Sequence, residues 1–174
     1  ATDNCGAVST ATFQLTVNSN PTITALGPLT RTQGAPATVS PIATVSDPDQ
    51  PANTLAVTVN GGASATVNGV SLSGITINPA GQVSATVGAS CGATNASFTL
   101  RVTDTFGAFA NATLVVNVLN ETTPPVINPI ANVVATLPNG SATSMPVTFP
   151  LPTATDNCGS VTVTTNPVSG SIFQ

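Results

Sequence analysis

Apolar and polar residues alternate with a period of two through most of this chain. Because successive side chains of a β-strand point to opposite faces, each such run predicts a strand with one apolar face. No segment carries the spacing of an amphipathic helix, so the pattern predicts an all-β fold. The runs are Phe13, Leu15, Val17; Leu55, Val57, Val59; Phe98, Leu100, Val102; Leu114, Val116, Val118; Met145, Val147, Phe149, Leu151; and Val161, Val163.

Turn-forming sequences separate these runs. They read NGG at residues 60–62, NG at 68–69, NPAG at 78–81 and PNG at 138–140. Asn and Gly tolerate positive φ, and Pro presets φ for a turn. Short strands rich in Val, Thr and Ile and spaced by such turns are typical of a β-sandwich.

Two proline-led stretches, at residues 18–21 and 120–125, divide the chain into three parts. We call residues 1–18 the head, 19–118 the middle and 119–174 the tail. The middle has about the length of one immunoglobulin-like domain. The sequence therefore predicts one complete sandwich between two shorter pieces.

Charge is scarce. Charged residues make up 5% of the chain, the net charge is −4, and the only cations are Arg31 and Arg101. No basic patch can follow a phosphate backbone, so nucleic acid is excluded as a partner. No apolar run approaches the ~20 residues of a membrane span. Because Ala1 stands where an initiator Met would, we interpret the chain as a mature or internal fragment.

The composition also argues against catalysis. The chain has no His and no Lys, so a Ser or Cys nucleophile lacks its ordinary base. The three cysteines, Cys5, Cys91 and Cys158, have no spacing typical of a metal site. We therefore expect no enzyme, an extracellular or cell-surface location, and one disulfide with one leftover thiol.

One hexamer occurs twice. The sequence ATDNCG at residues 1–6 returns at residues 154–159, and internal repetition of this kind is typical of an array. With PPVI at residues 124–127, FPLPTATDNCG at 149–159 and NPVSGS at 166–171, the tail resembles the opening strands of a hyalin-repeat (HYR) module. The head, with ATFQLTV at residues 11–17, resembles the closing strand of the same module.

The middle resembles bacterial cadherin-like or immunoglobulin-like repeats, through TVSDPD at residues 44–49 and RVTDTFG at 101–107. The resemblance implies tandem immunoglobulin-like sandwiches, one complete and one split between the two ends of the chain. Between residue 174 and a following copy of residue 1 the HYR pattern expects one further strand. We expect the head of a neighbouring copy to complete the tail, or the two to be joined in a longer polypeptide.

The resemblance also places Cys158 and Cys5 in loops at the same end of the split module. A disulfide between them, joining copies or modules, is one interpretation, and two buried thiols is the other. For Cys91 we expect a free buried thiol, with a disulfide between filaments as the alternative.

Two further kinds of site are candidates. Asp47, Asp49 and Asp104 fall in loops at one end of the middle, where they could bind calcium, the only cofactor we consider. The alternative is that they bind their own backbone in turns. The N-glycosylation pattern occurs at Asn95, Asn111, Asn120 and Asn139.

These observations favour a structural repeat segment of an extracellular filament or large surface adhesin. Its partners would be copies of itself or adjacent repeats of the same polypeptide. The alternative is an adhesive module that recognises glycan or protein through loops at the sandwich tip. The absence of Trp and Tyr, which are enriched at interface hot spots, weighs against that alternative.

Overall fold

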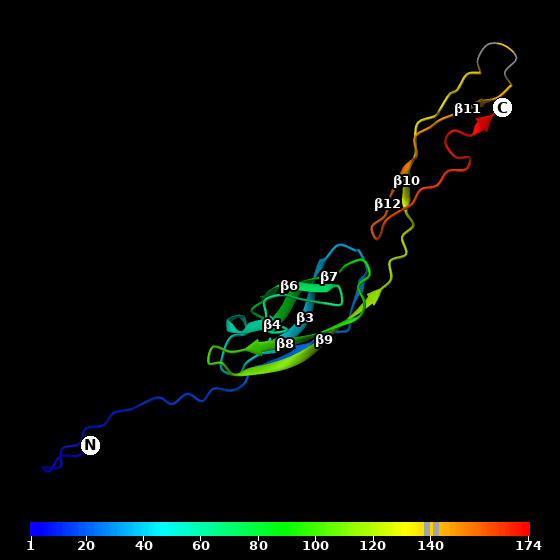
Figure 1. Ribbon diagram of the computed structural model, residues 1–174. Helices are drawn as coiled ribbons and strands as arrows, with labels where there is room; N and C mark the ends of the chain where they lie inside the picture. Colours follow the sequence, from blue (N-terminus) through cyan, green and yellow to red (C-terminus); the bar gives the residue numbers. More distant parts are fainter. Residues whose placement is uncertain (138–139, 141–142) are drawn as a thin grey trace.

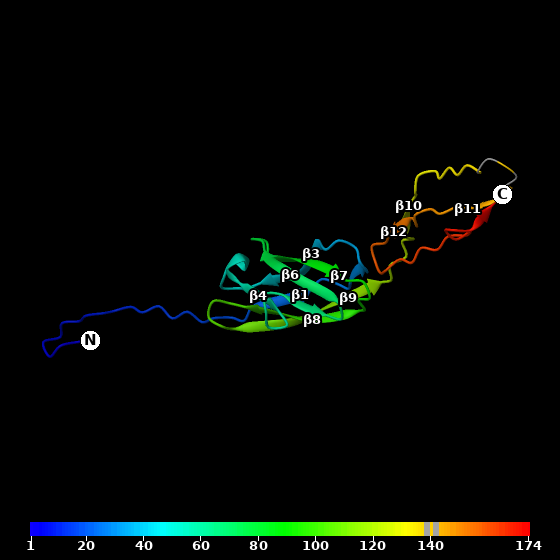
Figure 2. The same ribbon diagram turned by 45° about the horizontal axis from the view of Figure 1, so that its top comes forward.

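In a computed structural model, which describes residues 1–137, 140 and 143–174, the three parts follow one another along the molecule (Figure 1). The head is an extended arm, the middle is a β-sandwich, and the tail is a narrow lobe of chain. Head and tail leave opposite ends of the sandwich in both views (Figure 2).

The sandwich consists of two sheets. One has the order β1 (Thr22–Ala25), β3 (Thr38–Ser46), β7 (Gln82–Ala89), β6 (Val70–Ile77), β5 (Ala65–Val67). The other has the order β2 (Leu29–Thr32), β9 (Phe109–Leu119), β8 (Ala96–Thr103), β4 (Ala56–Val59). Neighbouring strands are antiparallel, except that β2 runs parallel to β9.

The core lies between these sheets. Alternation in β8 buries Phe98, Leu100 and Val102, and β9 adds Leu114 and Val116. Apart from Pro21, all buried hydrophobic side chains of the described residues lie between Ile42 and Val116. The expected all-β class with an immunoglobulin-like sandwich is therefore confirmed. One short 3₁₀ turn, η1 (Ala52–Thr54), connects β3 to β4.

Two of the predicted turns can be followed in detail. Asn68 and Gly69 join β5 to β6 with φ values of 50° and 78°, and a two-residue hairpin needs such positive values at both positions. At residues 78–81 the backbone N–H of Gly81 donates to the carbonyl oxygen of Asn78. Of the turn predicted at residues 138–140, Pro138 and Asn139 lie outside the described residues.

The described part of the tail contains two short ladders. β10 (Val126–Asn128) pairs with β12 (Thr153–Thr155), and β11 (Met145–Pro146) pairs with β13 (Ile172–Phe173). Of the run predicted from Met145 to Leu151, only Met145 lies in a strand. No described residue of the tail is buried. Two-stranded ribbons without a covering layer are marginal in water, which explains the short strands.

The strand predicted around Phe13 is not paired with any described residue. The head contains one isolated bridge, between Thr2 and Val8, and then runs on as an extended arm. Within the described residues, no helix is long and apolar enough to cross a membrane.

Candidate functional site

The head repeats the hairpin that joins β8 to β9. In that hairpin, Asp104 Oδ1 accepts hydrogen bonds from the backbone N–H of Phe106 (2.9 Å) and Ala108 (2.8 Å). In the head, Asp3 Oδ1 accepts them from Cys5 (3.0 Å) and Ala7 (2.7 Å). Each Asp also donates its own N–H to the carbonyl oxygen four residues later. The two turns therefore have the same local structure.

The similarity continues beyond the turn. Residues 2–17 (TDNCGAVSTATFQLTV) correspond one for one to residues 103–118 (TDTFGAFANATLVVNV). Phe13 and Leu15 thus take the positions of Leu114 and Val116, which are fully buried in β9. In the head, Phe13 is 89% exposed, Leu15 77% and Val17 75%. The head therefore has the alternating apolar pattern of β9 and covers no sheet of the described residues.

The tail repeats the opening of the sandwich. β10 follows Pro125 as β1 follows Pro21, and β10 pairs with β12 as β1 pairs with the end of β3. Beyond β12, Asp156 Oδ1 accepts the N–H of Cys158 (2.7 Å). Asp47 Oδ1, just beyond β3, accepts the N–H of Asp49 (2.8 Å) in the same way.

By this correspondence, residues 133–136 of the tail stand in the position of β2. Val133 is 47% exposed and Val134 88% exposed. In the sandwich, β2 is paired along its length with β9. Among the described residues, nothing pairs with this edge of the tail where the sandwich has its last strand, and the head carries the counterpart of that last strand, also without a pairing partner.

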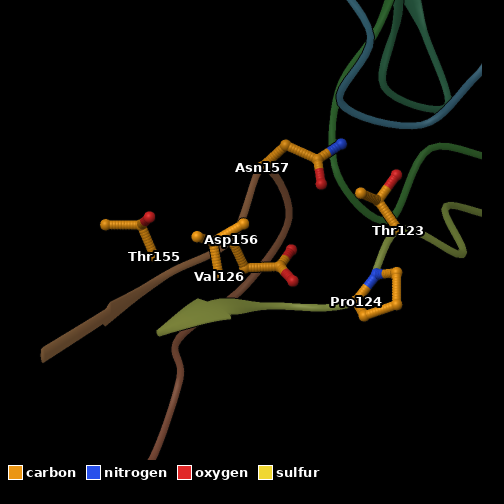
Figure 3. A pocket seen from close by; sticks show the side chains of 6 residues that line it. All are labelled: Thr123, Pro124, Val126, Thr155, Asp156 and Asn157. Carbon is orange, nitrogen blue, oxygen red and sulfur yellow. The ribbon is translucent and has the colours of Figure 1, made fainter. Parts of the chain in front are cut away.

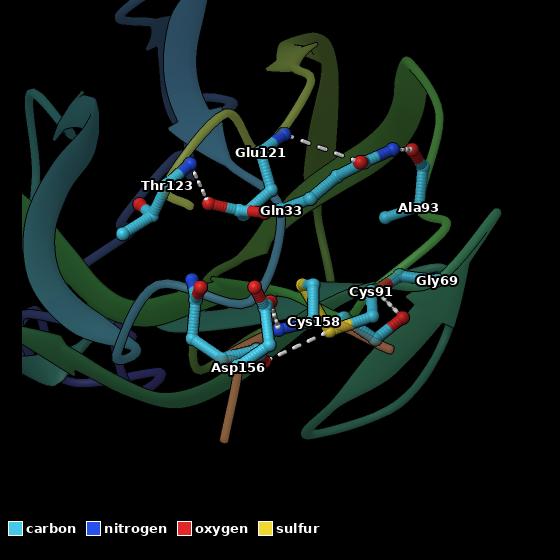
Figure 4. The surroundings of a disulfide bond; sticks show 10 residues. Gln33, Gly69, Cys91, Ala93, Glu121, Thr123, Asp156 and Cys158 are labelled. Carbon is cyan, nitrogen blue, oxygen red and sulfur yellow. Dashed lines mark hydrogen bonds between the residues drawn. A yellow bond between two sulfur atoms is a disulfide. The ribbon is translucent and has the colours of Figure 1, made fainter. Parts of the chain in front are cut away.

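The structure pairs Cys158 with Cys91, at a Cα–Cα distance of 5.3 Å (Figure 4). Cys5 is exposed and free. The expectation that Cys91 is a free buried thiol is therefore wrong for this chain. Sequence reasoning missed this bond because the two cysteines are 67 residues apart and lie in parts that it treated as separate domains. A bond from Cys5 to Cys158 of another copy stays a prediction, because the structure contains one chain.

Gln33 makes the second connection between sandwich and tail. Its Nε2 donates to the carbonyl oxygen of Ala93 (2.7 Å), and its Oε1 accepts the N–H of Glu121 (3.4 Å) (Figure 4). The bond to Glu121 holds the first residues of the tail, and the disulfide holds the turn after β12, against the loops at one end of the sandwich.

A hollow of about 460 Å³ lies beside this junction (Figure 3). It borders the turn at Asp156. In the sandwich, the corresponding turn at Asp47 ends at Gln50, whose Oε1 accepts the N–H and hydroxyl of Thr105 from the β8–β9 turn. No described residue of the tail makes such a contact with the turn at Asp156. The lining residues are Thr123, Pro124, Val126, Thr155, Asp156 and Asn157.

Two of the three candidate calcium ligands accept hydrogen bonds where the head joins the sandwich, and Asp47 Oδ1 accepts the backbone N–H groups of Asp49 and Gln50 in its own turn. Asp49 Oδ2 accepts the N–H of Ser19 (2.6 Å), and Asp104 Oδ2 accepts the side-chain amide of Asn18 (2.6 Å). Asp47 Oδ2 is buried without a hydrogen-bond partner. Among the described residues, no group of three or more His, Cys, Asp or Glu is placed to hold a metal ion. These contacts favour the turn interpretation, and calcium binding stays a prediction.

Hydrogen bonding also controls the charge of Asp104. Burial acts to raise the pKa of this carboxyl group. The amide of Asn18 and the backbone N–H groups of Ala108 and Phe106 outweigh that effect, and the pKa of Asp104 lies below its usual value. The ionised form is therefore the one that fastens the head to the sandwich.

The glycosylation candidates remain untested. Asn95, Asn111 and Asn120 are exposed, although Asn95 Oδ1 already accepts the N–H of Val118 (2.8 Å). Asn139 lies outside the described residues.

Comparison with known proteins gives one match to a family. Residues 18–117 match the family described as "Bacterial Ig domain". No curated protein matches. Among solved structures, the chain is similar to a protocadherin gammaB7 EC3-6 cis-dimer structure, with 15% identity and a TM-score of 0.40. That alignment covers 79% of this chain, and the chain spans 33% of the protocadherin chain.

Proposed function

Because this chain belongs to the bacterial Ig domain family, we propose that it is a structural repeat segment of an extracellular filament or large surface adhesin. Domains of this family are of a non-catalytic type and typical of surface and adhesive proteins. In the proposed role, copies join end to end, and the head of one copy completes the module that begins in the tail of another. The partner is a second copy or an adjacent repeat.

The observation that carries this proposal is the complementarity of the two open ends. The head matches β9 in sequence and turn geometry, and the tail matches the strands that β9 covers. Apolar side chains in both parts are exposed, from Phe13 in the head to Val134 in the tail. Exposed apolar surface of this kind marks an interaction site in a soluble protein.

The cysteines support an extracellular location and suggest how copies are sealed. In the sandwich, Thr105 donates to Gln50, and these residues correspond to Asn4 in the head and Gly159 in the tail. The same contact in a completed module would bring together the turns that carry Cys5 of one copy and Cys158 of another. The Cys5 thiolate then attacks Cys158 Sγ, the new S–S bond forms, and Cys91 leaves as a thiolate. This exchange needs no external oxidant and links successive copies covalently.

Electron microscopy of the purified full chain tests the structural role. We expect filaments whose axial repeat matches one sandwich plus one completed module. Reducing and non-reducing gels of the same sample show whether the copies are joined by disulfides. Dispersed monomers at high protein concentration that bind glycans would overturn the structural role and favour the adhesive alternative.

A further inference from the structure

We propose that the arm at residues 10–18 of one copy lies parallel to residues 133–136 in the tail of a second copy, in the register that β9 keeps with β2. This inference deepens the proposed function and rests on it. It specifies the surface, the direction and the residue pairs of the joint between copies.

The register follows from the sandwich itself. There, Leu29 is opposite Val116, Thr30 opposite Asn117, and Arg31 opposite Val118. The tail counterparts of Leu29, Thr30 and Arg31 are Val133, Val134 and Ala135, and the arm counterparts of the β9 residues are Leu15, Thr16 and Val17. The joint therefore sets Val133 opposite Leu15, Val134 opposite Thr16, and Ala135 opposite Val17.

The alternation of the arm favours this register over a slip by one residue. It directs Phe13, Leu15 and Val17 to the inner face, as β9 directs Leu114 and Val116. A slip by one residue would turn Gln14 and Thr16 inward and expose the apolar set. The partly covered face of the tail, which includes Val147 and Phe149, is what the arm would cover.

Neither segment carries the features that block edge pairing. Residues 10–18 read TATFQLTVN and residues 130–137 read IANVVATL, without a charged residue or proline in either. Protein edges that must stay single are commonly guarded by charges, prolines or bulges. An unguarded, apolar edge on each side favours pairing between them.

The occupant is a second copy because a chain cannot supply its own arm. The head leaves one end of the sandwich and the tail leaves the other (Figures 1 and 2). The Cys91–Cys158 bond and the hydrogen bond from Glu121 N–H to Gln33 hold the tail at that far end. The arm of another molecule is not held at the opposite end of this sandwich, so it can reach the tail.

Paired cysteines in the full chain test the register. In a Cys5→Ser background, Thr16→Cys with Val134→Cys places two thiols on directly opposite residues, within the Cα distance that a disulfide needs. We expect cross-linked multimers after mild oxidation, about tenfold more than from the matched control, Thr16→Cys with Val133→Cys, which is displaced by one residue. Mixing unlabelled and nitrogen-15-labelled chains before oxidation shows, by mass spectrometry of the linked peptides, whether the bond joins different molecules.

The cross-linking results distinguish the proposed register from the structural role as a whole. Linked peptides of mixed isotope from the Thr16 and Val134 pair support the joint. Equal linkage in the control, linkage only within one chain, or no linkage would overturn it. If microscopy still shows filaments in those cases, the structural role stands and only this register fails. If filaments are absent as well, both fail.

Discussion

The sandwich and the tail open with similar sequence and reach different structures. In each, a strand that follows a proline pairs antiparallel with a second strand, which runs into an Asp turn. In the sandwich, β8 and β9 then lie across these strands and bury Phe98 and Leu114. The tail has no described strand in those positions, and none of its described residues is buried. The opening strands thus need the closing pair before a core can form.

Burial of the arm's apolar side chains against the tail would add a free energy whose size can be compared with the cost of association. Burying one side chain the size of Phe, Leu or Val is worth about 1.5–3 kcal/mol. Three such side chains in the arm would together contribute several kcal/mol. Association costs about 4–15 kcal/mol in lost translational and rotational freedom. Backbone pairing along the arm, and a covalent bond between copies, would therefore be needed for a durable joint.

The largest expected difference between the two regions is the response to loss of a Phe side chain. Phe98→Ala removes a fully buried ring and should lower the free energy of unfolding by about 3–5 kcal/mol, measured by urea denaturation. Phe13→Ala in dilute, monomeric protein should change it by less than about 0.5 kcal/mol, since that ring is exposed. A large loss from Phe13→Ala under those conditions would show that the arm already packs within its own chain.

Removal of the disulfide is the next largest change. Cys158→Ser frees the tail from the sandwich, and disulfides typically contribute about 2–4 kcal/mol. We expect faster amide hydrogen exchange at β10 and β12, with little change in β8. Cys91→Ser should behave in the same way, and Cys5→Ser, which alters an exposed free thiol, should leave the exchange unchanged. Unaltered exchange in Cys158→Ser would mean that Gln33 alone holds the junction.

A smaller contrast concerns two glycines at positive φ. Gly69→Ala places a Cβ against Ala93 and Ser90 at φ +78°, and should cost about 1–3 kcal/mol in the same denaturation assay. Gly6→Ala meets nothing within 4 Å at φ +85°, in a head that is separate from the core. Its effect on sandwich unfolding should be too small to measure. Equal effects would contradict the separation of head and sandwich.

Much of the sandwich could be predicted from sequence, because large residues alternate in β8 and β9. The alternation of apolar and polar residues is weaker in β6 and β7, because Ala, Ser and Thr lie between their few large residues. The predicted strands at Phe13 and Val161 failed to form because a strand depends on a neighbour that a local pattern does not supply. The Cys91–Cys158 bond joins two parts across a linker, and no local spacing encodes it.

The smallest expected contrast concerns the two equivalent Asp turns and their dependence on pH. Because the pKa of Asp104 is lowered in the folded chain, its contribution to stability is present above the unfolded value of about 4. It is lost as the pH falls through the lower folded value.

Asp104→Asn keeps an oxygen for the turn but loses the charge that binds Asn18. The midpoint temperature of unfolding of this variant should therefore be lower than that of the parent chain at neutral pH. Below about pH 4 this temperature should depend less on pH in the variant than in the parent. Asp3→Asn changes the same turn where no Asn18 contact exists, and its profile should follow the parent. A parent-like profile for Asp104→Asn would show that the carboxylate does not fasten the head to the sandwich.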